Sequence, residues 1–181
     1  MTASVNHKDH NGFTPLHIAV DNHQIKLAQF LILRGAGVDD KTNNFKTPIH
    51  ISCENKDLDL FILLFNSRAS LFSQDLEGNT PLHLLCQNEC IEIIKWIKKN
   101  YDLKYLLNIK NHNSRLPFEM TKNLEIYNIL SNINKNIPFY PKLSNDLNKL
   151  QLPLDKIKSA KVEKPIGDEF EDELDIDYSL S

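Results

Sequence analysis

The stretch NTPLHLLCQ, residues 79–87, places a histidine and a cysteine three positions apart, just after a proline. His83 and Cys86 would share one face of a helix, because three residues make about one helical turn. Such a pair could supply two ligands to a zinc ion, or a thiol nucleophile together with its base. Either arrangement depends on what the rest of the chain brings to the same place.

The same pattern recurs along the chain at a fixed interval. GFTPLHIAVDN begins at Gly12, FKTPIHISCEN at Phe45 and GNTPLHLLCQN at Gly78, so the interval is 33 residues both times. A degraded fourth copy, SRLPFEMTKN, begins at Ser114. An apolar segment with helical periodicity follows each of the first three copies. Each unit is therefore predicted to be a helix–turn–helix, which must stack on its neighbours to bury its apolar faces.

Each of the three full copies opens with the signals of a helix start. A threonine can cap the helix, a proline follows at the first helical position, and the histidine can reach back to the cap backbone. The capping threonines are Thr14, Thr47 and Thr80. The second helix of the first unit is expected to end at Gly35, which can take the left-handed conformation that often closes a helix.

This repeat settles how the histidines and cysteines are interpreted. The histidines form one column along the predicted stack: His17, His50 and His83. Neighbours in such a column lie roughly 8–10 Å apart, whereas zinc ligands lie about 2.0–2.3 Å from the ion, so they cannot share one. Cys53 and Cys86 form a second column with Val20, which is typical of a small buried apolar slot. Both columns are predicted to be structural.

Other signals of catalysis or cofactor binding are weak. Trp96 shares a column of the second helices with Phe30 and Leu63, which favours core packing over a binding anchor. The five glycines form no phosphate-binding loop, and no Gly-x-Ser-x-Gly, Cys-x-x-Cys or His-Glu-x-x-His motif occurs in the sequence. We therefore expect a protein that is not an enzyme and has no cofactor, no metal ion and no small-molecule substrate.

Composition narrows the class of protein further. With 41% hydrophobic and 25% charged residues, the chain is typical of a soluble globular protein. No apolar run approaches the ~20 residues that span a bilayer, so no membrane partner is expected. A net charge of −3 argues against nucleic acid as a partner. Three cysteines cannot form a disulfide framework, which favours an intracellular location, the cytoplasm first and the nucleus as the alternative.

The 33-residue period and its Gly-x-Thr-Pro-Leu-His-x-Ala pattern resemble the ankyrin repeat family over about residues 8–131. The resemblance implies an all-α solenoid of three full repeats and a degraded C-terminal capping repeat, followed by an extended tail. Phe45 replaces the family's glycine in the second repeat. In the fourth repeat, Leu116 replaces the threonine and Glu119 the histidine.

Residues 132–181 are predicted to be an extended or disordered tail with an acidic C-terminal segment. Residues 168–177 hold seven acidic residues and no basic one. In ELDIDYSLS, Leu174, Ile176 and Tyr178 alternate with polar residues, the pattern of a strand that could add to a partner's sheet edge. A one-turn helix pairing Phe170 with Leu174 is the rival interpretation, and a solubilising acidic tail is the third.

The predicted function is a non-enzymatic protein–protein interaction module, an adaptor or scaffold that joins a protein complex. The alternative is a structural subunit of a large assembly, with the tail threaded along neighbouring subunits. In the ankyrin family, partners dock on the concave face, which is lined by the turn tips and the exposed ends of the first helices. The corresponding candidate residues are His10, Asn11, Phe13, Asp21, Asn22, Asn44, Lys46, Glu54, Asn55, Glu77, Asn79, Gln87, Asn88, His112 and Arg115, with Phe170, Leu174, Ile176 and Tyr178 in the tail.

Overall fold

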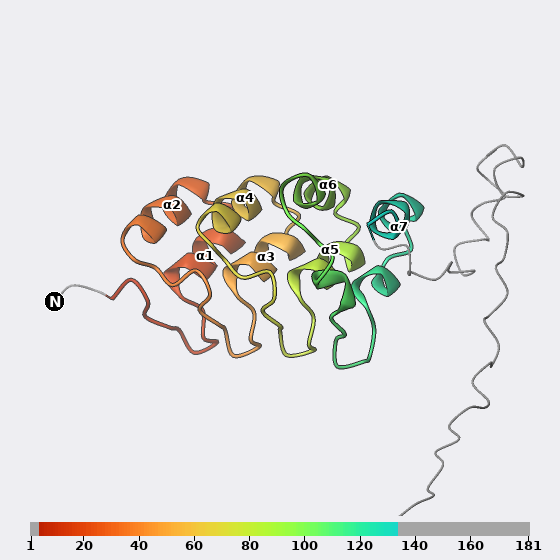
Figure 1. Cartoon of the computed structure of the whole chain (residues 1–181). Helices are drawn as coiled ribbons and strands as arrows, with labels where there is room; N and C mark the ends of the chain where they lie inside the picture. Colours follow the sequence, from red (N-terminus) through yellow and green to blue (C-terminus); the bar gives the residue numbers. More distant parts are fainter. Residues whose placement is uncertain (1–3, 134–181) are drawn as a thin grey trace, which may run out of the picture. The chain divides into compact units, whose positions relative to one another are not determined.

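The computed structural model describes residues 4–133, which form a stack of helix pairs (Figure 1). The elements are α1 (Pro15–Asp21), α2 (Ile25–Leu33), α3 (Pro48–Glu54), α4 (Leu58–Asn66), α5 (Pro81–Gln87), α6 (Ile91–Asn100), the 3-10 helices η1 (Leu106–Asn108) and η2 (Pro117–Met120), and α7 (Leu124–Ser131). No strand occurs within residues 4–133. The predicted all-α repeat solenoid is therefore confirmed for the part of the chain that the structure describes.

The helices form two rows. The inner helices α1, α3 and α5 pack on one another in order, and each also packs on its own outer helix, α2, α4 or α6 (Figure 1). The outer helices pack on one another along the second row, and α7 continues that row beyond α6. Each repeat therefore buries its apolar side chains against its own helix pair and the next one, which is why the units depend on stacking.

The three inner helices begin as the sequence predicts. The backbone N–H of each capping threonine donates to Nδ1 of the histidine three residues later, at 3.1 Å in the first repeat and 3.2 Å in the next two. In the first repeat, the Thr14 hydroxyl also accepts from the N–H of His17. Each inner helix therefore starts with a reciprocal cap that satisfies backbone groups which the helix itself leaves unpaired.

The core is built from the repeated columns. Val20, Cys53 and Cys86 are fully buried, which confirms the predicted apolar slot. Trp96 packs edge-on against Phe61 and Phe65, with ring centroids 6.1 and 5.2 Å apart, so the prediction of core packing holds for this residue.

Phe30, the first member of that column, is not buried in the core. Half of Phe30 is exposed, because no helix pair precedes α2 in the described stack. The ring instead lies beneath the guanidinium of Arg34, whose Cζ is 5.0 Å from the ring centroid.

Positions with a left-handed backbone recur with the repeat. Gly12 and Gly78 have φ near +79° and +78°, and Phe45 and Ser114 adopt +58° and +59° at the equivalent positions of the turns. Gly35 closes α2 with a φ of +86°, as predicted. The repeat geometry therefore overrides the residue type where the family's glycine is missing.

The fourth repeat departs from the others as its sequence suggested. Pro117–Met120 forms a 3-10 helix instead of an α-helix, and the Leu116 N–H donates to Oε2 of Glu119 at 2.6 Å. A carboxylate thus takes the place of the histidine ring at the helix start. Asn123 then caps α7 by accepting the backbone N–H groups of Glu125 and Ile126. The predicted domain limit at residue 131 stays a prediction.

Candidate partner-binding face

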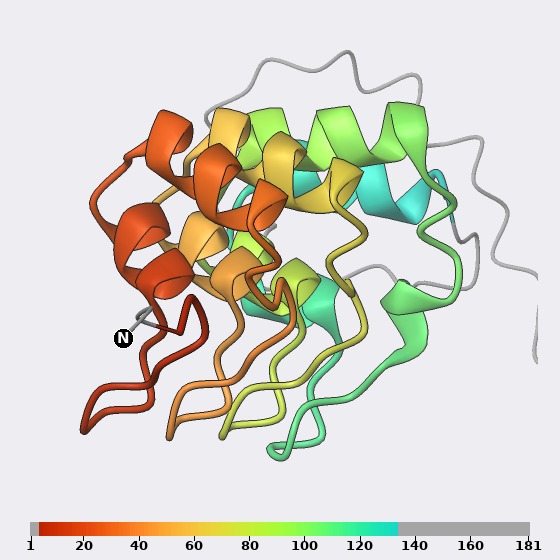
Figure 2. The ribbon, with the colours of Figure 1, turned by 90° about the vertical axis from the view of Figure 1, so that its left-hand side faces the viewer.

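Four turns lead into the inner helices and lie next to one another (Figure 2). Each turn is closed by the same backbone hydrogen bond, from its first residue to its fifth, at 2.9 to 3.0 Å. The turns span residues 9–13, 42–46, 75–79 and 111–115. Together with the exposed C-terminal ends of α1, α3 and α5, they make the surface that we call the inner face.

Backbone hydrogen bonds connect each turn tip to the next. The N–H groups of Asn43, Leu76 and His112 donate to carbonyls of the preceding tip, each at 2.9 Å. The acceptors are Asn11, Asn44 and Glu77. These bonds satisfy the backbone at the tips and fix the spacing of the turns, so the tip side chains are presented at regular intervals.

A polar side chain at the first position of each turn shapes it from within. The carboxylate of Asp75 accepts the backbone N–H groups of Glu77 and Asn79, at 2.9 and 2.8 Å. Asn111 does the same for Asn113 and Arg115 in the fourth turn. These positioning residues were not predicted from the sequence, although an Asp, Thr or Asn at the start of each turn is a signal of this role.

Asn79 was predicted to be a contact residue but is buried. Its side chain is only 1% exposed, so the expectation that it faces a partner is wrong. Its amide nitrogen donates to Glu77 Oε2 at 3.1 Å, and its oxygen accepts from the amide of Asn111 at 2.8 Å. Asn79 therefore joins the third turn to the fourth and does not serve as a contact residue.

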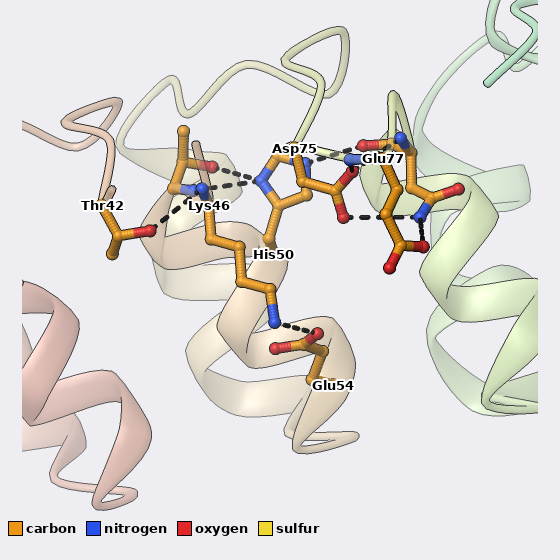
Figure 3. A network of polar contacts seen from close by, with 8 residues as sticks. Thr42, Lys46, His50, Glu54, Asp75 and Glu77 are labelled. Carbon is orange, nitrogen blue, oxygen red and sulfur yellow. Dashed lines mark hydrogen bonds and ion pairs between the residues drawn. The ribbon is translucent and has the colours of Figure 1, made fainter. Parts of the chain in front are cut away.

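Lys46 and Glu54 form an ion pair across the inner face (Figure 3). Nζ of Lys46, in the second turn, lies 2.6 Å from Oε1 of Glu54, at the end of α3. Each side chain is about one-third exposed. The two predicted contact residues thus neutralise one another and brace a turn against its helix.

Phe13 and Arg115 occupy the same turn position in the first and fourth repeats but differ in environment. Phe13, a candidate contact residue, is half-buried against the core, and its ring meets the ring of His17 edge-on at 5.7 Å. Arg115 is exposed, and its guanidinium makes no ion pair or hydrogen bond to another residue within 4–133. Arg115 is therefore the more accessible of these two candidate residues.

The ends of the inner helices carry the remaining predicted residues. The Asn22 amide donates to the carbonyl of Ile18 at 2.9 Å, and the Asn55 amide donates to the carbonyl of Asp21 at 3.3 Å. Gln87 is exposed and Asn88 is half-buried at the end of α5. The structure therefore brings the turn tips and helix ends of neighbouring repeats onto one surface.

The exposed members of the candidate set are His10, Asn11, Asp21, Asn22, Asn44, Glu77, Gln87, His112 and Arg115. Phe170, Leu174, Ile176 and Tyr178 lie outside the described residues. Amides are the commonest group on the exposed surface, and both signs of charge are present. Amide side chains donate and accept hydrogen bonds, so the inner face is suited to a polar protein surface.

The ring nitrogens of the three column histidines make hydrogen bonds inside the stack, as Figure 3 shows for His50. Nδ1 accepts from the cap, so the ring proton lies on Nε2 and donates to a carbonyl of the following turn. In the second repeat, Nε2 of His50 lies 3.1 Å from the oxygen of Ser73 and 3.2 Å from that of Asn79. The equivalent rings reach Lys46 and Arg115. Both ring nitrogens are therefore engaged with backbone.

Burial also sets the protonation of these groups. Burial lowers the pKa of His50 to about 4, and it lowers the pKa of His17 and His83 as well. Burial raises the pKa of the Cys86 thiol, which stays protonated near neutral pH. His83 and Cys86 are thus a neutral ring and a neutral thiol in the core. Within residues 4–133, no three His, Cys, Asp or Glu side chains gather as metal ligands.

Comparison with known proteins agrees with the geometry. Residues 24–111 match the family model of ankyrin repeats in three copies. No curated protein matches the chain. The match and the helical stack together place this protein in the ankyrin repeat family, whose members are generally protein–protein interaction modules and typically not enzymes. Within the described part of the chain, no helix is long and apolar enough to cross a bilayer.

Proposed function

We propose that this protein is an adaptor or scaffold that docks a partner protein on its inner face, with the tail adding a second contact. The observation that carries the proposal is the division of polar groups within each repeat. The side chains of the histidines, the capping threonines and Asn79 are buried and hydrogen-bonded inside the stack, whereas the side chains of Asn11, Asn44 and Arg115 are exposed on successive turns.

The chemistry of the inner face indicates how a partner would be held. Asp21 and Glu77 are exposed acids, Arg115 is an exposed base, and Lys46 is paired with Glu54. Because positive and negative charges are present in similar number, hydrogen bonds from amide side chains are expected to be the main polar contribution to partner binding. Association through this face should therefore depend only weakly on salt, in contrast to binding steered by a strongly charged surface.

The location proposed for this module is the cytoplasm, with the nucleus as the alternative. Cys53, Cys86 and Cys90 are all buried and unpaired, which suits a reducing compartment.

Site-specific photo-cross-linking tests the docking face. A photoreactive residue is placed at position 44, in a turn tip, or at position 98, on the outer helix α6, and each protein is irradiated in an extract of the expressing cells. The proposal predicts a discrete protein adduct from position 44 and none at the same mass from position 98. Adducts from position 98 alone would show that the outer helices are the docking surface.

Purified protein, cross-linked in the same way, separates an adaptor from a subunit of a large assembly. An adaptor should purify as a stable monomer and form the adduct only when the partner is added. A protein that is aggregated or misfolded when purified alone would favour the assembly subunit.

A further inference from the structure

The first helix pair exposes apolar side chains at positions that every later repeat buries. Ile18 is 46% exposed, whereas the equivalent Ile51 and Leu84 are 3% and 5% exposed. Leu27 is 42% exposed, whereas its equivalents Leu60 and Ile93 are 0% and 1% exposed. In the later repeats these side chains are covered by the preceding helix pair. Ile18, Leu27 and Phe30 together form what we call the first-repeat end face.

The last repeat, at the opposite end of the described stack, has a different exposed surface. None of the large apolar side chains of η2 and α7 is among the strongly exposed ones. The exposed side chains of α7 are Glu125 and Asn128, and the buried ones include Ile126 and Leu130. The last repeat thus presents a polar surface, as a capping repeat does, while the first repeat keeps the surface of an internal one.

Charge around the first-repeat end face is also distinctive. Lys26, Phe30 and Arg34 are four residues apart along α2, so they lie on one side of the helix. The outer helices α4, α6 and α7 each carry an acidic residue in the first turn, whereas α2 carries none. Asp21 of α1 is the one exposed acid on the inner helix of this repeat. The face is therefore apolar with a basic border along α2.

We propose that the chain's own residues 168–178 cover the first-repeat end face. The sequence of this segment complements an apolar face with a basic border. It has apolar side chains at Phe170, Leu174, Ile176 and Tyr178, and it contains seven acidic residues and no basic one. Apolar side chains would fill the exposed surface of Ile18, Leu27 and Phe30, and carboxylates would lie near Lys26 and Arg34.

The chain is long enough to make this contact within one molecule. The 34 residues between positions 133 and 168 reach roughly 110 Å when extended, at about 3.3 Å per residue. Four stacked repeats at roughly 10 Å spacing place their first and last members only about 30 Å apart. Because a tether of this kind gives the segment a high effective concentration at the face, a modest affinity is enough for the contact to form within one molecule. A partner that binds the tail would uncover this face.

Zero-length cross-linking of the full chain tests the proposal. A carbodiimide joins a lysine amine to a carboxylate that touches it, and peptide mass spectrometry locates the bond. We expect bonds from Lys26 to the acids of 168–177 in preference to bonds from Lys98 on α6. Mixing isotope-labelled with unlabelled protein shows whether each bond lies within one molecule.

Two pairs of substitutions supply the matched comparison. Leu27→Ser with Phe30→Ser should lower the Lys26 cross-link by roughly tenfold, because the apolar contact is lost. Phe72→Ser with Leu76→Ser, which changes exposed apolar side chains elsewhere, should leave it unchanged. Leu174→Ser with Ile176→Ser, in the tail itself, should reproduce the tenfold loss without touching the repeats.

Three results would overturn the proposal. The first is no preference of the 168–177 acids for Lys26 over Lys98. The second is a Lys26 cross-link that survives both the Leu27/Phe30 and the Leu174/Ile176 substitutions, which would leave charge alone as its cause. The third is a cross-link found only between labelled and unlabelled molecules, which would show that a second copy covers the face.

Discussion

The histidine column and the turn tips belong to the same repeats, yet they use their polar groups in opposite ways. His17, His50 and His83 are fully buried, and each links a helix cap to a carbonyl of the next turn. A backbone hydrogen bond joins each tip to the next, with added side-chain bonds from Asn43 and His112, whereas the side chains of Asn44 and Arg115 are exposed. Identical residues recur in the column, whereas the tips differ from repeat to repeat.

This difference shows how a repeat protein separates stability from recognition. A column residue must satisfy the same buried partners in every repeat, so its type cannot change without cost. A tip side chain meets solvent, so it is open to variation once the turn itself is secured by backbone and by a buried residue such as Asp75. Stability should therefore respond to column substitutions, and binding should respond to tip substitutions.

The largest expected effect is on stability, at the centre of the column. His50→Ala removes the acceptor for the Thr47 N–H, leaves two carbonyls without their donor and opens a cavity. We expect the free energy of unfolding to fall by roughly 3 kcal/mol, measured by urea denaturation. Asn44→Ala at a tip should change it by less than about 0.5 kcal/mol. Similar losses from both substitutions would erase the distinction between column and tip.

The column should also make stability depend on pH. The pKa of His50 is lowered by burial to about 4, so the unfolded chain binds this proton first as the pH falls. Stability is therefore full above pH ~6.5 and is lost progressively from there toward pH 4. The shifted pKa of His50 alone should lower the free energy of unfolding by roughly 1 kcal/mol between pH 7.5 and 5.5. His17 and His83 act in the same direction, because burial lowers the pKa of each.

Urea denaturation of the wild type and of His50→Gln at the two pH values checks this dependence. The wild type should lose more stability than the variant as the pH falls. A loss of equal size in both proteins would assign the effect to groups other than this ring.

The smallest expected effect concerns the backbone of the second turn. Phe45 adopts a φ of +58° where the first and third turns have glycine, and this conformation strains a residue with a Cβ. Phe45→Gly should raise the free energy of unfolding by roughly 0.5 kcal/mol, since relief of strain outweighs the loss of a half-exposed ring.

The opposite change at a matched position serves as the control for Phe45. Gly78→Ala should be destabilising, because its Cβ would come within 2.6 Å of the His112 ring. If both substitutions lowered stability, the ring of Phe45 would matter more to the fold than its backbone conformation.

Much of the fold could be predicted from sequence because its determinants are local and repeated. Thr-Pro-x-His defines a cap within four residues, and the 33-residue interval places the buried columns. What could not be predicted depends on contacts between repeats. Nothing near His50 in sequence shows that Nε2 reaches Asn79, 29 positions along the chain.

The candidate face was predicted less accurately for the same reason. Asn79 has the polarity of a surface residue, and only Asn111 of the next repeat makes its burial favourable. Phe13 is partly covered by the core and by His17, which the tip position alone does not reveal. A residue type indicates exposure only when every neighbour that could pair with it is known.

Titration of a purified partner that the wild-type chain captures shows whether recognition resides on the inner face. Three proteins are compared by calorimetry: the wild type, Asn44→Ala with Arg115→Ala on the inner face, and Asp59→Ala with Lys98→Ala on the outer helices. All three should unfold at the same urea concentration, because the changed side chains are exposed. We expect the partner affinity of the inner-face variant to fall by roughly tenfold or more, and the outer-helix variant to bind like the wild type. Unchanged binding by the inner-face variant, together with weaker binding by the outer-helix variant, would contradict this expectation.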